Sequence, residues 1–295
     1  MKRAFLLIIA IFISFYSFSQ DTIKQHRPVK KFIPLEVYEN HFGKTSDTTE
    51  FMYKDNDTLV RVPNDFDPFE DQDGVKVEYE PKDSTFLSIY KNIVYNTGKS
   101  GTSKERMRYW KDEIKIYFDE SVPALHSKEL MDFAENISKG IDSLNISRNF
   151  IPEKANYHVY YLNREHTTDY EPRIGNSKGG YYISWNGKQQ IYDAKLKINT
   201  ELNKGDKYQI QHLKFHFFKS LGHFKSSEQL KCESYLSACN TSREITPIDL
   251  ELLSYHYSYD ICKGVDLNTF TEQTERFNKQ LKEEPNSKIY VIHVE

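Results

Sequence analysis

Apolar and polar residues alternate in short segments along most of this chain, and a period of two predicts β-strands. Strands are predicted at residues 58–62, 75–79, 113–118, 156–162, 179–187, 191–198 and 289–293. Glycines stand at both ends of the segment 179–187, which marks the limits of that strand.

Other segments have the 3.6-residue spacing of helices. One helix is predicted to begin at Ser127 as its N-cap. Its buried stripe comprises Leu130, Phe133, Ala134, Ile137 and Ile141. Another helix is predicted at residues 210–221. Its face toward the core comprises Ile210, Leu213, Phe217 and Leu221. Thr246, Pro247 and Asp249 predict the start of a third helix, and residues 266–284 suggest a fourth.

The first 19 residues have the composition of a signal peptide. Lys2 and Arg3 precede an apolar run over residues 4–18, and small residues, Ser17 and Ser19, occupy the recognition positions of a cleavage site. An uncleaved membrane anchor would need a longer apolar span. We therefore expect an exported protein, periplasmic or secreted, without a transmembrane segment after cleavage.

Composition divides the rest of the chain into three parts. Residues 55–83 contain ten acidic and three basic residues, and the flexible, basic segment 98–104 follows. These features predict an acidic N-terminal extension at 20–98, a main domain at 105–265 and a C-terminal helix and strand at 266–295.

The overall composition limits the classes of partner. The net charge of −3 gives no reason to expect nucleic acid as a partner. Aromatic residues form 14% of the chain, which suggests an aromatic-packed interior. A tyrosine-rich surface that binds glycans or another envelope surface is the alternative interpretation.

A second stripe on the helix at 210–221 holds the candidate chemistry. His212, His216, Lys219 and His223 follow the i, i+4, i+7, i+11 series. Two His at i and i+4 can bind one metal ion, but Lys219 would place a positive charge beside it. His223 is about 10 Å farther along the axis than His216, unless the chain turns at Gly222. The sequence predicts no cofactor, and zinc bound by these three His is the alternative.

The same run has the outline of the motif H-E-x-x-H-x-x-G-x-x-H. When Leu221-Gly222 is aligned with its glycine, its three His fall on Phe215, Lys219 and Lys225, and its Glu falls on His216. Gly222 itself is expected to end the helix with φ > 0, where only small residues are tolerated. All four functional positions are therefore changed.

The element order and this degenerate motif resemble the metzincin-like branch of zinc peptidases over residues 105–265. The resemblance implies an α+β fold: a mixed sheet with a long helix, an active-site-type helix and C-terminal helices. It also implies that 180–186 is a substrate-binding edge strand. The turn that places a Met beneath the metal corresponds to residues 234–237, with Leu236 in the place of the Met.

The changed motif predicts a protein without peptidase activity that binds a protein or peptide partner in its cleft or extension. An active zinc peptidase with unusual ligands, drawn from His212, His216, His223 and Glu228, is the alternative.

Three cysteines occur in the last quarter of the chain. In an exported protein they allow one disulfide and one free thiol. Cys232–Cys239 is slightly favoured because its loop is short, and Cys232–Cys262 stays open.

Overall fold

The computed structural model describes residues 30–54, 57–64, 66, 75–98, 104–239 and 242–293. The expected signal peptide at 1–19 lies outside these residues. The chain divides into two units, Met1–Gln72 and Asp73–Glu295, which are described separately. None of the helices in the described ranges is long and apolar enough to cross a membrane.

The smaller unit contains an antiparallel sheet in the order β1-β3-β2, together with one helix, α2. Its elements are β1 (Lys31–Pro34), α2 (Leu35–Phe42), β2 (Phe51–Lys54) and β3 (Asp57–Val62). Ile33, Val60 and Val62 are buried in it. The alternation predicted at 58–62 therefore corresponds to a strand with a buried face.

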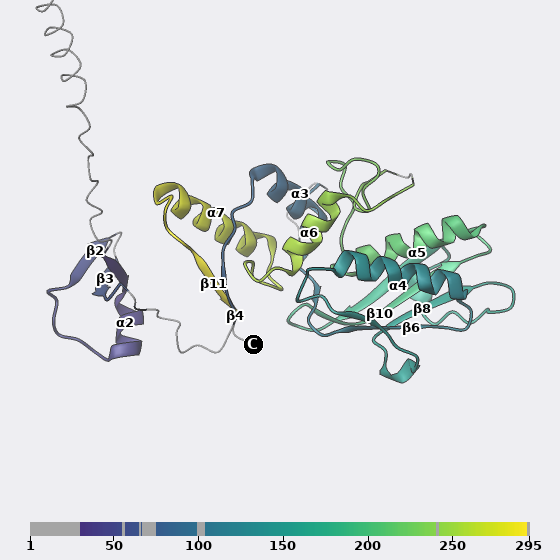
Figure 1. Ribbon diagram of the computed structural model, residues 1–295, viewed down its shortest axis with the longest axis horizontal. Helices are drawn as coiled ribbons and strands as arrows, with labels where there is room; N and C mark the ends of the chain where they lie inside the picture. The colour runs from purple at the N-terminus through teal and green to yellow at the C-terminus, as the bar shows by residue number, and fades with distance from the viewer. Residues whose placement is uncertain are drawn as a thin grey trace, which may run out of the picture. The chain divides into compact units, whose positions relative to one another are not determined.

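A mixed sheet forms one end of the larger unit (Figure 1). Its strands run in the order β5-β10-β8-β6-β7 and are parallel, and β9 is antiparallel to β10. The strands are β5 (Tyr109–Trp110), β6 (Ile114–Phe118), β7 (Ile146–Arg148), β8 (Tyr157–Leu162), β9 (Gly179–Trp185) and β10 (Gln190–Asn199). Short 3-10 helices occur at Pro152–Lys154 and Pro172–Ile174. Strands and helices in this arrangement agree with the predicted α+β class.

Two helices, α4 (Ala124–Ser138) and α5 (Asp206–Ser220), lie side by side over one face of this sheet (Figure 1). The predicted N-cap of α4 was wrong. The helix begins one turn earlier, after Pro123, and the Ser127 hydroxyl donates to the Ala124 carbonyl inside the first turn. Proline is tolerated at this position because its missing N–H costs no helical hydrogen bond, and Ser127 therefore stands inside the helix.

Three further helices surround an aromatic part of the same core. They are α3 (Ser84–Tyr95), α6 (Pro247–Tyr257) and α7 (Leu267–Glu283). The ring centroid of Tyr90 in α3 is 4.8 Å from that of Tyr255 in α6 and 5.3 Å from that of Phe270 in α7. The strands β4 (Val75–Glu78) and β11 (Tyr290–His293) pair antiparallel.

The boundaries expected from composition differ from the structural ones. The structure divides at Gln72/Asp73, so α3 belongs to the larger unit and not to an extension at 20–98. The acidic run ends at Asp83, whose carboxylate caps α3 by accepting from the amides of Thr85 and Phe86. The expected separate part at 266–295 also belongs to this unit, because Phe270 is buried in the main core.

The second face of β10 holds a buried cation that the sequence pattern did not indicate. Lys197 is 1% exposed, and its ammonium is 2.8 Å from the Asp169 carboxylate. The Tyr160 hydroxyl donates to the same carboxylate at 2.6 Å. The β8–β9 connection therefore closes this face of the sheet with a paired charge instead of apolar side chains.

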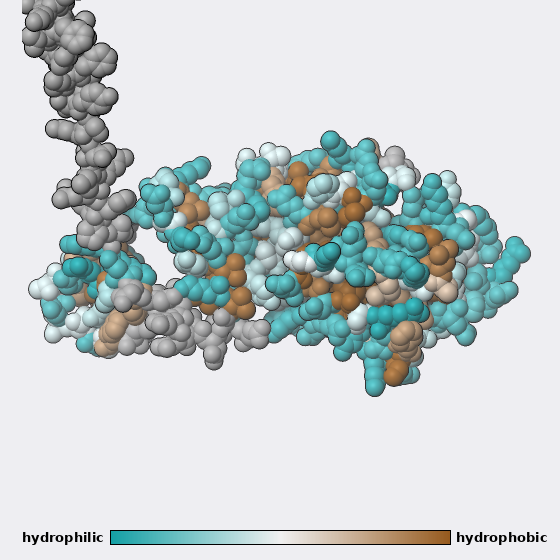
Figure 2. Space-filling view, viewed as in Figure 1, coloured by the Kyte–Doolittle hydropathy of each residue, from teal (hydrophilic) through white to brown (hydrophobic). Residues whose placement is uncertain are grey.

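The outer surface is mainly hydrophilic, with separate apolar patches on the face shown in Figure 2. Phe150 and Ile151, which follow β7, are among the exposed apolar residues, at 74% and 46%.

Candidate functional site

The helix α5 presents the stripe that the sequence singled out. It begins after Gly205, whose φ of 89° is accessible to glycine at little cost. Leu213 and Phe217 are fully buried on the core side, as predicted, and so is Leu221 at the C-cap. The predicted partner Ile210 is only partly buried, and Gln209 is buried instead. The opposite side, with His212, His216 and Lys219, therefore borders β9.

The strand β9 approaches this stripe closely. A Cβ atom on Gly179 would lie 2.8 Å from Cδ1 of Ile198 and 3.3 Å from Cδ2 of His216, so glycine allows the strand to approach both side chains. The ring centroid of Tyr181 is 6.3 Å from that of His216 and 5.9 Å from that of His223. The ring centroids of His212 and His216 are 5.8 Å apart. The three His and Tyr181 therefore form one cluster.

The chain turns after α5, but at a different residue than expected. His223 has the left-handed φ of 54°, whereas Gly222 does not have a positive φ. The Tyr181 hydroxyl and Nδ1 of His223 share a hydrogen bond of 3.3 Å. A small residue is still required at 222, because a Cβ there would lie 2.4 Å from the Phe224 ring. The reason is packing and not backbone conformation.

Burial and neighbouring cations favour the neutral form of these His. Burial lowers the pKa of His216 to about 3, with further lowering by His212, Lys219 and Arg243. Burial likewise lowers the pKa of His223 to about 3, and Lys225 and Arg108 act in the same direction. Burial is also the largest cause that lowers the pKa of His212.

The positions of the zinc motif hold aromatic and cationic side chains. The Phe215 ring centroid is 5.2 Å from the Lys219 ammonium and 4.2 Å from the Arg243 guanidinium. The Lys219 ammonium also donates to the Ser226 hydroxyl at 3.0 Å. The Lys225 ammonium is 3.7 Å from the Glu105 carboxylate, and its backbone amide donates to the Ile93 carbonyl at 2.7 Å.

This donor set does not fit zinc in the arrangement that the motif provides. Zinc is bound by thiolate, imidazole and carboxylate groups. Phe215 has no donor atom, and Lys219 and Arg243 would repel a divalent cation. Within the described ranges, no group of three or more His, Cys, Asp and Glu is placed to hold a metal ion. Glu228, the other proposed ligand, is exposed in the loop after α5.

Residues 234–237 lie in a turn between α5 and α6. Leu236 is fully buried, and its carbonyl accepts from the Ser227 amide at 2.8 Å. The buried Asp249 carboxylate of α6 accepts from the Ser234 hydroxyl at 2.6 Å and from the Tyr235 amide at 3.2 Å. One carboxylate therefore joins this turn to the start of the next helix.

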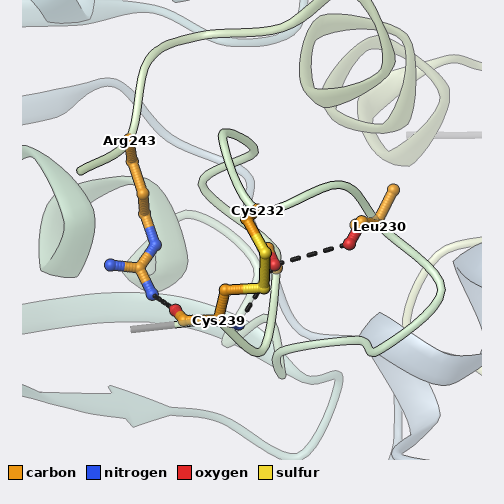
Figure 3. Close-up of a disulfide and its surroundings, with 5 residues drawn as sticks. Leu230, Cys232, Cys239 and Arg243 are labelled. Atoms are coloured by element: carbon orange, nitrogen blue, oxygen red, sulfur yellow. Dashed lines mark hydrogen bonds between the residues drawn. A yellow bond between two sulfur atoms is a disulfide. The ribbon is translucent and has the colours of Figure 1, made fainter. Parts of the chain in front are cut away.

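A disulfide closes the loop that contains this turn (Figure 3). Cys232 is bonded to Cys239, the pairing that the short loop favoured, and Cys262 is a free thiol. Figure 3 shows Arg243 reaching back to donate to the Cys239 carbonyl. The closed loop thus helps to place the Arg243 guanidinium beside Phe215.

Several residues of this site were missed by sequence reasoning. The Arg108 guanidinium is 4.2 Å from the Trp185 ring centroid, and it donates to the Glu105 carboxylate at 2.7 Å. Arg108 and Arg243 are distant from α5 in sequence and belong to segments without a recognisable pattern. Trp185 and Tyr181 had a signal, since they stand at alternate positions of the predicted strand.

A separate open groove of about 1020 Å³ lies between α3 and α7. Charged residues of both signs line it, including Lys82, Asp83, Glu272 and Lys282. It contains no His or Cys and none of the α5 stripe, so it adds nothing to the chemistry of the candidate site.

Comparisons with known proteins give a weak likeness to solved structures and no match of other kinds. No family model and no curated protein matches the chain. Among solved structures, the crystal structure of archaemetzincin from Methanopyrus kandleri is similar at 12% identity and a TM-score of 0.25. The match covers 58% of this chain and 96% of that one. A TM-score this low does not define a common fold.

Proposed function

We propose that this chain is an exported, metzincin-like protein without peptidase activity, and that it binds an extended peptide or protein segment along β9. The observation that supports this function is the edge position of β9. It pairs with β10 on one side, and no other strand in the described ranges pairs with its second side. An open edge can bind an extended peptide through main-chain hydrogen bonds.

The replaced motif is the reason to propose binding without cleavage. Peptide hydrolysis of this type needs a metal that activates water and a carboxylate base. Phe215 and Lys219 occupy two ligand positions, and His216 occupies that of the base. Around them lie aromatic rings and cations, which can hold a ligand but cannot activate water as a bound metal does.

The test combines metal content, cleavage and peptide protection. The purified full chain is dialysed against zinc, analysed by mass spectrometry and incubated with a peptide library. We expect no stoichiometric zinc and no cleavage, while bound peptides slow amide hydrogen exchange in β9. One zinc per chain that is lost in His212→Ala/His216→Ala, together with chelator-sensitive cleavage, would instead establish an active peptidase. Glycan binding without protection of β9 would favour the surface-binding interpretation.

A further inference from the structure

The charges around the α5 stripe indicate which class of peptide would bind there. The neighbouring charges that act on the three His are mostly positive. Within the described ranges, Glu105 is the one carboxylate among them, and the cations are Lys178, Lys219, Lys225, Arg108 and Arg243. Five positive charges against one negative charge create a local positive potential, although the whole chain has a net charge of −3.

Two of these cations share one aromatic ring. Lys219 and Arg243 come from α5 and from the loop before α6, and both lie against Phe215. Lys219 donates to the Ser226 hydroxyl and Arg243 to the Cys239 carbonyl. These two bonds orient the ammonium and the guanidinium beside the ring.

A lysine on the same helix, outside the stripe, provides a comparison. The Lys214 ammonium also lies near an aromatic ring, 5.8 Å from the centroid of Phe133. It is paired with the Glu129 carboxylate at 2.7 Å. Lys214 thus has the same charge as Lys219 and a similar aromatic contact. It lies away from the cations that surround the three His.

We propose, on the basis of the peptide-binding function above, that the bound segment is acidic and that Lys219 and Arg243 bind a Glu or Asp side chain over Phe215. A carboxylate matches both donors, since guanidinium and ammonium groups form charge-assisted hydrogen bonds to it. The aromatic rings of Phe215, Tyr181 and Trp185 provide apolar contact for the rest of the segment.

The experiment measures fluorescence anisotropy with labelled eight-residue peptides. C-terminally amidated peptides rich in Glu, Gln or Lys are compared, together with a Gln peptide that has a free C-terminal carboxylate. The Glu peptide should bind most tightly, and Lys219→Met should weaken it about tenfold at low salt. Lys214→Met is the matched control, because it removes the same charge from the same helix, and it should change the affinity less than about twofold.

A second pair of measurements protects the test against misfolding. Lys219→Arg keeps the charge and should retain most of the affinity for the Glu peptide. Raising the salt from about 0.05 to 0.5 M should weaken binding of the Glu peptide but not of the Gln peptide. Equal binding of Gln and Glu peptides would overturn the acidic specificity, and tighter binding of the free C-terminus would replace it with terminal carboxylate recognition. Both results would leave the peptide-binding function intact, whereas the absence of any peptide binding would refute that function itself.

Discussion

A Cβ atom on Gly222 would lie 2.4 Å from Cε1 and Cζ of Phe224, and 2.8 Å from Nε2 of His256. The ring and the imidazole thus occupy the space that a larger residue needs. We expect Gly222→Val to lower the free energy of unfolding by about 2 kcal/mol or more, because the core must shift. Chemical denaturation measures this.

The control for this substitution is Gly187, which has no atom within 4 Å of the position that a Cβ would occupy and no positive φ. Gly187→Val should leave the unfolding free energy nearly unchanged. Equal losses of stability at both positions would show that the contact with Phe224 does not limit the size of the side chain at position 222.

Asp249 is fully buried and accepts four hydrogen bonds. The donors are the Ser234 hydroxyl, the Tyr235 amide, and the amide and hydroxyl of Thr246. Asp249→Ala would leave these donors without their acceptor, and we expect a loss of about 3 kcal/mol in unfolding free energy. The exposed Asp142→Ala is the control. A loss no larger than that of the control would mean that the turn is held by other contacts.

The paired charge on the second face of the sheet allows a double-mutant cycle. Asp169→Asn leaves the buried Lys197 ammonium without its counter-charge and should cost about 2 kcal/mol, since the Asp169 side chain is itself 30% exposed. Adding Lys197→Met should recover much of that loss. The exposed pair Lys128–Asp132 provides the comparison, and Asp132→Asn should have little effect. No recovery in the double variant would contradict a direct pairing.

His256 predicts sensitivity to acid. Its Nε2 donates to the Arg108 carbonyl at 2.9 Å and its Nδ1 accepts from the Tyr90 hydroxyl at 3.1 Å, so the buried ring is neutral. Burial, followed by Lys263, lowers its pKa to about 3 from 6.5. Below pH 6.5 the unfolded chain binds a proton that the folded chain does not, so stability falls as the pH decreases toward 3.

At pH 5, His256 alone should lower the free energy of unfolding by about 2 kcal/mol. His216 and His223 change in the same direction. Unfolding measured at pH 7 and pH 5 should show the loss, and His256→Gln should reduce it. An identical pH dependence in that variant would assign the acid sensitivity to other groups.

The disulfide should affect both stability and binding. Replacing both bonded cysteines, Cys232→Ser/Cys239→Ser, opens a short loop and should cost about 2 kcal/mol. Because Arg243 donates to the Cys239 carbonyl, the affinity for the Glu peptide should fall as well. Cys262→Ser removes the free thiol and serves as the control. Unchanged affinity in the double variant would show that the loop does not position Arg243.

The sequence predicted elements whose signal is local. The capping box of Thr246 and Asp249 was identified from three residues and is present in α6. The period of two in β10 also agrees with its buried face, with Ala194, Leu196 and Ile198 in the core. Such signals depend only on neighbouring residues, so they can be read without knowing the fold.

Features that depend on distant contacts were not predicted. The helix α3 was overlooked because the acidic composition around it suggested an extension, although Asp83 and the apolar residues Phe86, Ile89 and Ile93 had a helical signal. Arg243 reaches Phe215 only through the folded loop. The contact at Gly222 was anticipated as a requirement for a small residue but explained by the wrong cause.

The pairing of β4 with β11 has a consequence for how the larger unit folds. Tyr290 near the end of the chain pairs with Glu78 near the start of this unit. Phe86 and Tyr90 of α3 likewise contact Tyr255 of α6, which is synthesised much later. Contacts between segments so distant in sequence slow folding, because a long loop must close before they form. We therefore expect the apolar face of α3 to stay exposed until α6 and α7 have been synthesised, and β4 to stay unpaired until β11 follows.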